Sequence, residues 1–250
     1  MSGDLPIAER ERLLAHARAL VGVTLAELAD GLGLPVPAGR VRTKGWSGQI
    51  IERELGAGDS PGRGQDFAAL GIELKTVPVD RDLVPRESTA VCQIDPIAIA
   101  GESWETSYLR QKLSQVLWVG LEVPSRVGSR RALLGADHRG KAWKPSQGFH
   151  INDLGSVGDR RVVAVRLWTP SPDEQALLRA DFELFVRSYF RRGRGAAITG
   201  HQGQVLQVRP KGRNAADLRR AFGPTGEPTQ IGKCGFYLRP GFVARILRGK

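Results

Sequence analysis

The sequence is best interpreted outward from Gln65-Asp-Phe-Ala-Ala-Leu-Gly-Ile-Glu-Leu-Lys75, a weak turn that runs into an apolar strand. Successive side chains of a strand point to opposite faces, so Glu73 and Lys75 share one face and the intervening apolar residues point into the core. Asp66 arrives from the segment just before the strand. Carboxylate oxygens bind the hard cation Mg²⁺, and an ammonium group polarises the attacking water or stabilises phosphate charge. The stretch therefore predicts a centre for cleavage of a phosphodiester.

A plainer interpretation of the same residues stays open at this point. An acidic residue two positions before a lysine occurs by chance on many strands, and most such pairs lie on a solvated face. The motif needs support from its surroundings before it indicates catalysis.

Composition limits the class of protein. The chain has 250 residues, enough for one large domain or two small ones, and its hydrophobic fraction of 41% is ordinary for a globular protein. The sequence contains no apolar run of the roughly 18 residues that a membrane span needs, and Met1–Asp4 lacks a secretory signature. Two cysteines, Cys92 and Cys234, provide neither a disulfide framework nor a zinc cluster. A reducing cytoplasm is the expected location, without membrane association.

The net charge of +11 is unevenly distributed along the chain. Residues 187–250 hold 14 Lys and Arg against 2 Asp and Glu, whereas the rest holds 23 against 24. A basic segment beside a nearly neutral one is typical of proteins that bind polyanions such as DNA. The alternative is an arginine-rich composition with no bearing on partners.

Periodicity and end signals predict a mixed α+β domain without internal repeats. Helices are expected over 7–21, 24–31, 46–55, 105–115, 172–190 and 214–222, the second opened by a capping box at Thr24 and the last by Asn214. Strands are expected over 71–79, 88–94, 116–123, 162–168, 205–209 and 236–238. Residues 126–161, with 8 basic and 3 acidic positions, are expected to form an extended loop or hairpin insertion.

Two further charged residues are candidates for the same centre. Glu52 lies on the helix expected just before the motif and is a possible third carboxylate for metal. Lys112 lies on the helix expected over 105–115. For each of them, taken alone, a solvated surface position is the simpler interpretation.

Six stretches, taken together and in order, resemble the MutH family of mismatch-repair endonucleases. They are Lys44-Gly-Trp-Ser-Gly followed by Glu52, the run from Gln65 to Asp80, Trp104-Glu-Thr-Ser107 with Lys112, Val116-Leu-Trp118, Leu206-Gln-Val-Arg-Pro-Lys211 and Gly235-Phe-Tyr-Leu238. The resemblance extends from about Leu13 to the C-terminus, with residues 125–161 longer than is usual for the family.

The resemblance implies one domain over residues 1–250, with a basic insertion at about 125–161. The fold would be restriction-endonuclease-like: a mixed sheet flanked by helices, with two arms that form a DNA-binding cleft. It also implies Mg²⁺-dependent nicking of the unmethylated strand at hemimethylated GATC sites in double-stranded DNA. The protein would be monomeric in solution. MutL would activate it after MutS has found a mismatch.

The resemblance assigns roles residue by residue. Asp66 and Glu73 match the metal-binding carboxylates, Lys75 the catalytic lysine, Glu52 an additional active-site glutamate that joins the metal ligands, and Lys112 a lysine near the phosphate.

DNA contacts are expected at Lys44, His201, Lys211 and Tyr237. Of these, Tyr237 matches the tyrosine that helps to sense adenine methylation. One position departs from the family, because His201 stands where an arginine reads guanine. Arginine can donate two hydrogen bonds to guanine O6 and N7, which histidine cannot do in the same way. The recognition sequence is therefore less certain than the nuclease chemistry, and Gln202 or Gln204 are alternative readers.

Three hypotheses follow from these observations. The first is a MutH-like, strand-discriminating endonuclease of mismatch repair. The second is a restriction-type endonuclease of the same fold that cuts both strands with altered sequence or methylation specificity, which His201 and the long basic insertion favour. The third is a DNA-binding protein with an inactive centre, against which the intact set of acidic and lysine residues argues.

Overall fold

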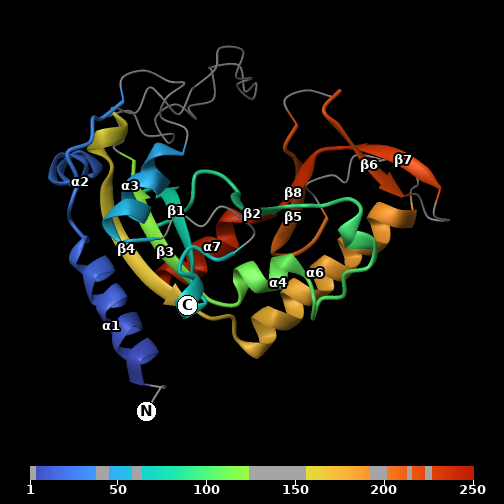
Figure 1. Cartoon of the computed structure of the whole chain (residues 1–250), viewed down its shortest axis with the longest axis horizontal. Coiled ribbons are helices and arrows are strands. Elements are labelled where there is room, and N and C mark those ends of the chain that lie inside the picture. The colour runs from blue at the N-terminus through green and yellow to red at the C-terminus, as the bar shows by residue number, and fades with distance from the viewer. Residues whose placement is uncertain are drawn as a thin grey trace, which may run out of the picture. The chain divides into compact units, whose positions relative to one another are not determined.

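The computed structural model describes residues 4–37, 45–57, 64–123, 156–191, 202–212, 216–222 and 227–250 (Figure 1). The chain divides into two compact units. Unit 1 comprises Met1–Asp59, Thr76–Leu83 and Val119–Val165, and unit 2 comprises Ser60–Lys75, Val84–Trp118 and Arg166–Lys250. A single domain with a basic insertion at 125–161 stays a prediction, and residues 124–155 lie outside the described part.

Unit 1 contains the helices α1 (Asp4–Ala19), α2 (Leu25–Gly31) and α3 (Trp46–Glu54) and the short turn η5 (Val157–Asp159). The predicted capping box is present: Thr24 Oγ1 accepts from the Glu27 amide at 3.2 Å, and the Glu27 carboxylate accepts from the Thr24 amide at 2.7 Å. This satisfies two amide groups that the first turn of α2 leaves without partners. Helix α2 contacts α3 and η5, and Ile50 and Ile51 of α3 are fully buried.

One sheet has strands from both sequence halves, in the order β1 (Glu73–Val79), β3 (Val116–Glu122), β4 (Arg161–Trp168). Each of the three strands is divided between the two units, with some of its residues in unit 1 and the others in unit 2. Residues 116–121 of β3 are all buried, as expected for a central strand that is covered on both faces. The strands predicted over 71–79, 116–123 and 162–168 are confirmed.

Unit 2 contains an antiparallel sheet in the order β2 (Thr89–Gln93), β8 (Cys234–Leu238), β5 (Leu206–Pro210). Helix α4 (Tyr108–Leu113) contacts β2, and α6 (Pro172–Arg191) contacts β5 and the short turn η3 (Ala98–Ala100) (Figure 1). An aromatic cluster joins these layers. The ring of Phe182 lies 5.8 Å from that of Trp104 and 5.9 Å from that of Phe236.

The prediction of a helix over 214–222 is wrong for residues 218–222. Residues Leu218–Phe222 form strand β6, which pairs antiparallel with β7 (Pro228–Gly232). The segment Asp-Leu-Arg-Arg-Ala has good helix formers, but cross-strand pairing overrides a weak local preference. Helix α7 (Pro240–Arg248) is an element that was not predicted from the sequence. A proline in its first turn and Gly249 just beyond its last residue mark its two ends.

At the level of secondary-structure class, the mixed α+β prediction is confirmed. None of the helices in the described ranges is long and apolar enough to cross a membrane.

Candidate active site

The turn before β1 brings Asp66 beside the start of that strand. The 3₁₀ helix η2 (Ala68–Leu70) ends at Gly71, whose φ of 65° lies in the left-handed region that glycine adopts readily. Phe67 and Ile72 then exchange backbone hydrogen bonds at 2.9 and 3.2 Å. As a result the chain folds back on itself, and Asp66 Oδ2 accepts from the Leu74 amide at 2.7 Å. Eight residues of sequence separate these partners, so the turn determines where the Asp66 carboxylate lies.

Gln65 fixes this turn to α4. Its side-chain amide donates to the Gly71 carbonyl at 2.7 Å, and to the Gln111 carbonyl and Ser114 Oγ at 3.2 Å each. The side chain is buried. A buried amide with these partners connects the segment that holds Asp66 to the helix that holds Lys112.

Glu73 is a buried carboxylate between two lysines. It is 2% exposed; its Oε1 accepts from Lys75 Nζ at 2.5 Å, and its Oε2 accepts from Lys112 Nζ at 2.7 Å. Lys112 Nζ also donates to the Gly64 carbonyl at 2.6 Å. An isolated buried carboxylate would be strongly unfavourable, and charge-assisted hydrogen bonds from two cations compensate for its loss of water.

The N-terminus of helix α4, which carries Lys112, is stabilised by a side-chain cap. Ser107 is its N-cap: Ser107 Oγ accepts from the Arg110 amide at 3.1 Å and donates to the Trp104 carbonyl at 2.9 Å. Burial lowers the pKa of Lys112, but the hydrogen bond and negative charge of Glu73 outweigh this effect, so the pKa lies above its usual value. The surface interpretation of Lys112 is thus wrong, because the residue is buried against an acidic partner.

Glu52 lies on α3 in unit 1, whereas Asp66, Glu73, Lys75 and Lys112 lie in unit 2. A Cβ added at Gly48 would lie 3.5 Å from both Glu52 Oε1 and Thr76 Oγ1. These polar atoms therefore flank the same glycine. The role of Glu52 as a third metal ligand stays a prediction.

The donor set at the centre can be compared with the needs of a metal ion. Within the described ranges no group of three or more His, Cys, Asp and Glu is placed to hold one. Mg²⁺, however, is usually held by one or two carboxylates together with waters and substrate phosphates. Asp66, which accepts from the Leu74 amide, and the adjacent Glu73 are the two carboxylates of this segment. Each carboxylate oxygen has two lone pairs, so a Glu73 oxygen that accepts from one lysine retains a site for a cation. The residues fit Mg²⁺.

Tyr237 lies among cations on the sheet of unit 2. Its ring lies 5.6 Å from the guanidinium of Arg209 and 5.8 Å from Lys211 Nζ, distances at which cation–π attraction operates. Burial raises the pKa of Tyr237. Two of the four predicted DNA-contacting residues, Lys211 and Tyr237, are thus neighbours. The other two, Lys44 and His201, lie outside the described residues.

A second buried carboxylate, Asp181 of α6, anchors the start of β5. It is 3% exposed, and its Oδ2 accepts from the amides of Gln204, Val205 and Leu206 at 2.9, 2.7 and 2.8 Å. Gly203 has a φ of 80°, and a Cβ there would lie 2.6 Å from the Leu206 carbonyl. Asp181 was not among the residues predicted from the sequence. The signal was a carboxylate at position 181 on the helix face defined by 178, 182 and 185.

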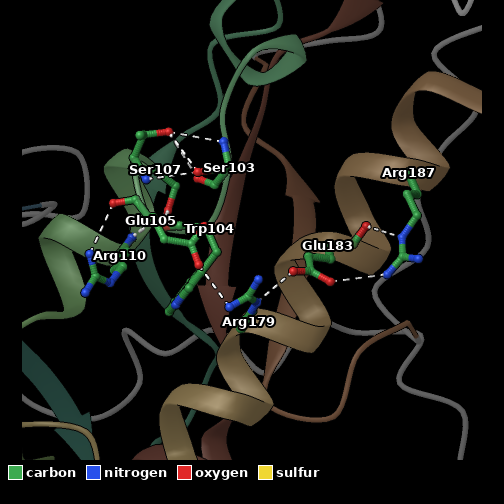
Figure 2. A network of polar contacts seen from close by, with 9 residues as sticks. Ser103, Trp104, Glu105, Ser107, Arg110, Arg179, Glu183 and Arg187 are labelled. Atoms are coloured by element: carbon green, nitrogen blue, oxygen red, sulfur yellow. Dashed lines mark hydrogen bonds and ion pairs between the residues drawn. The ribbon is translucent and has the colours of Figure 1, made fainter.

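The outer side of α6 carries a chain of ion pairs. Arg179 bridges Glu105 at 2.9 Å and Glu183 at 2.8 Å, and Glu183 also lies 3.4 Å from Arg187 (Figure 2). Arg179 and Glu105 are about half exposed, so each pair contributes little to stability. The chain nevertheless connects the segment before α4 to the helix that carries Asp181.

Comparison with known proteins gives consistent matches. The family described as "DNA mismatch repair enzyme MutH" matches residues 55–147. A "DNA mismatch repair protein MutH" from Klebsiella pneumoniae is 39% identical over 242 residues, 97% of this chain and 92% of that protein. Proteins of the same name from Vibrio cholerae and Shewanella amazonensis are each 38% identical. The match to the Vibrio cholerae protein covers 96% of this chain and 95% of that protein. The match to the Shewanella amazonensis protein covers 99% of this chain and 98% of that protein.

Proposed function

This chain belongs to the MutH family of DNA mismatch repair enzymes, and on that premise we propose that its catalytic centre is built on β1 and α4. The chain is a MutH-like mismatch repair endonuclease and acts on DNA. One observation supports the proposed location above all others: Lys75 and Lys112 both donate to the buried carboxylate of Glu73, and Asp66 accepts from the amide of the adjacent Leu74. Glu52 is included in the proposal as a further acidic residue.

Asp66 and Glu73 would hold Mg²⁺, as the fit of their oxygens to a hard cation supports. When bound, Mg²⁺ supplies positive charge that polarises a phosphate oxygen and acidifies water. The residues of the chain do the rest. Asp66 is oriented by the Leu74 amide, and Glu73 is oriented by two lysines, so neither carboxylate has to reorganise when substrate arrives.

Lys75 and Lys112 would stabilise the phosphate during the reaction. Hydrolysis forms a bond between water oxygen and phosphorus and breaks the bond to the leaving oxygen, with the two in line. Negative charge accumulates on the phosphate oxygens at that stage. Both ammonium groups can donate hydrogen bonds to these oxygens while they remain near Glu73, which carries the compensating charge.

For specificity, we propose nicking of the unmethylated strand at hemimethylated GATC sites, with activation by MutL downstream of MutS and a monomer in solution. The finer fold prediction, a restriction-endonuclease-like sheet with two arms that form a DNA-binding cleft, belongs to the same proposal, as does a cytoplasmic location. Family membership supports each of these points. Tyr237, flanked by Arg209 and Lys211, is proposed to sense adenine methylation, with Lys44, His201 and Lys211 as further DNA contacts.

The test is a plasmid-cleavage assay with Mg²⁺ on unmethylated, hemimethylated and fully methylated GATC substrates, with and without MutL. An Asp66→Ala variant is the control. Nicking confined to the unmethylated strand, and absent in the variant, supports the proposal. Wild-type cleavage by the Asp66→Ala variant would place the centre elsewhere.

A second candidate function is favoured by His201, which stands where the family has an arginine that reads guanine. A restriction-type enzyme of the same fold would give linear product, or cutting that ignores methylation, in the same assay. Nicked product from the hemimethylated plasmid alone would exclude it.

A further inference from the structure

A cleft in unit 2 has one residue of the candidate centre, Lys112, in its lining. Its volume is about 580 Å³, within the range of roughly 300–1,000 Å³ typical of ligand sites. Its lining comprises residues 91–97 from β2 and the turn that follows, Tyr108 and Lys112 of α4, and Arg219 and Arg220 of β6. Lys112 also donates to Glu73, so this residue links the cleft to the candidate active site.

Cationic residues outnumber acidic ones in the lining of the cleft. Three cationic residues line it, of which Lys112 is ion-paired with Glu73 and Arg219 with Asp217. The acidic residue of the lining, Asp95, accepts from the amides of Ile97 and Ala98 at 3.0 and 3.1 Å. A cleft with this charge selects an anion.

The β6–β7 hairpin holds the two arginines at the edge of the cleft. Its register pairs Arg219 with Ile231 and Arg220 with Gln230. Arg219 Nη1 lies 2.7 Å from Asp217 Oδ1, which orients the guanidinium. Arg220, by contrast, has no carboxylate of the described residues within ion-pair distance. The planar fork of arginine matches two phosphate oxygens at once, which makes this residue type the usual choice for phosphate contacts.

We propose that this cleft binds the sugar–phosphate backbone of DNA next to the phosphate that is cleaved, with Arg219 and Arg220 as phosphate-contacting side chains. The inference rests on the proposed function, since it takes Lys112 to mark the position of the reacting phosphate. It adds two residues that the resemblance to the family did not assign. Arg219 and Arg220 would raise the affinity for DNA and position the strand, whereas the residues around Glu73 would carry out the hydrolysis.

The experiment measures binding of a fluorescent GATC duplex by anisotropy over a series of salt concentrations, with a chelator present so that the duplex stays uncut. The variant is Arg219→Gln/Arg220→Gln. Loss of two phosphate contacts should lower the slope of log K against log salt by about 2 and weaken binding roughly tenfold at moderate salt.

Two control variants make the result specific. Arg10→Gln/Arg12→Gln removes the same charge from exposed positions of α1 and should leave the slope nearly unchanged. Arg219→Lys/Arg220→Lys keeps the charge, and it should preserve the slope while losing part of the affinity. An unaltered slope in the glutamine variant, or an equal loss in the α1 variant, would overturn the proposal. Failure of the wild-type protein to bind the duplex here, together with failure to cut DNA when Mg²⁺ and MutL are present, would instead refute the proposed function.

Discussion

Lys112 Nζ lies 2.7 Å from Glu73 Oε2, although 39 residues of sequence separate the two. Lys75 occupies the other oxygen of the same carboxylate from only two residues away. One buried anion thus organises a local cation and a distant one. The proposed centre is therefore an element of the fold as well as a reaction site, and its residues should affect stability and activity separately.

Asp66→Asn should separate the charge of Asp66 from its structural role. The amide oxygen of asparagine can still accept from the Leu74 amide, whereas the negative charge for the cation is lost. We expect Mg²⁺-dependent cleavage to fall by at least about 100-fold, with DNA binding and the unfolding midpoint close to wild type. Cleavage and thermal unfolding measured on the same preparation give the answer, and substantial residual activity would contradict the assignment of Asp66 as a metal ligand.

Lys75→Met and Lys112→Met should both abolish most activity but differ in stability. Lys112 is the more buried of the two, at 10% side-chain exposure against 18% for Lys75, and it alone also binds the Gly64 carbonyl. We expect Lys112→Met to lower the free energy of unfolding by about 2–3 kcal/mol and Lys75→Met by about half as much. Urea titration measures both, and equal losses would contradict the difference in burial.

The stability of the protein should depend on pH through Lys112. The pKa of Lys112 is raised in the folded state. Its contribution to the free energy of unfolding is therefore complete below the pKa of the unfolded state, about 10.4, and is lost as the pH rises from that value through the pKa of the folded state. The difference in unfolding free energy between wild type and Lys112→Met should therefore be constant from pH 7 to 9 and shrink above pH 10. A difference that grows with pH would have the wrong sign.

Asp181→Ala should destabilise the chain more than Asp181→Asn. Alanine leaves the amides of Gln204, Val205 and Leu206 without their shared acceptor, whereas asparagine retains one oxygen. We expect a loss of about 3 kcal/mol for alanine and less for asparagine. Backbone hydrogen exchange of residues 204–206 provides an independent readout, because loss of the acceptor should increase exchange there first.

Gly203→Ala tests the same anchor from the opposite side. The added Cβ meets the Leu206 carbonyl and requires a left-handed φ, so we expect a loss of about 1–3 kcal/mol. Gly241→Ala is the matched control, since a Cβ there meets no atom within 4 Å and its φ is not left-handed. The control should be neutral or slightly stabilising.

Much of the fold could be predicted where local signals are strong. The capping box at Thr24 and the apolar spacing of residues 172–190 predicted two helices that the structure confirms. Predictions were wrong where a distant partner decides. Residues 218–222 form a strand because residues 228–232 pair with them, and Lys112 is buried because Glu73 compensates its charge. Spacing along one segment carries no information about such partners.

The Asp181 carboxylate attaches the start of β5 to α6 through main-chain amides. Amide groups are present whatever side chain a residue carries, proline excepted. Exposed residues of this segment, such as Gln204, can therefore be exchanged while the attachment to α6 persists. Gly203 and the buried Val205 cannot vary in this way, but variation at an exposed position such as Gln204 is decoupled from the risk of unfolding. Such a position is a favourable place for a new sequence preference to arise by single substitutions.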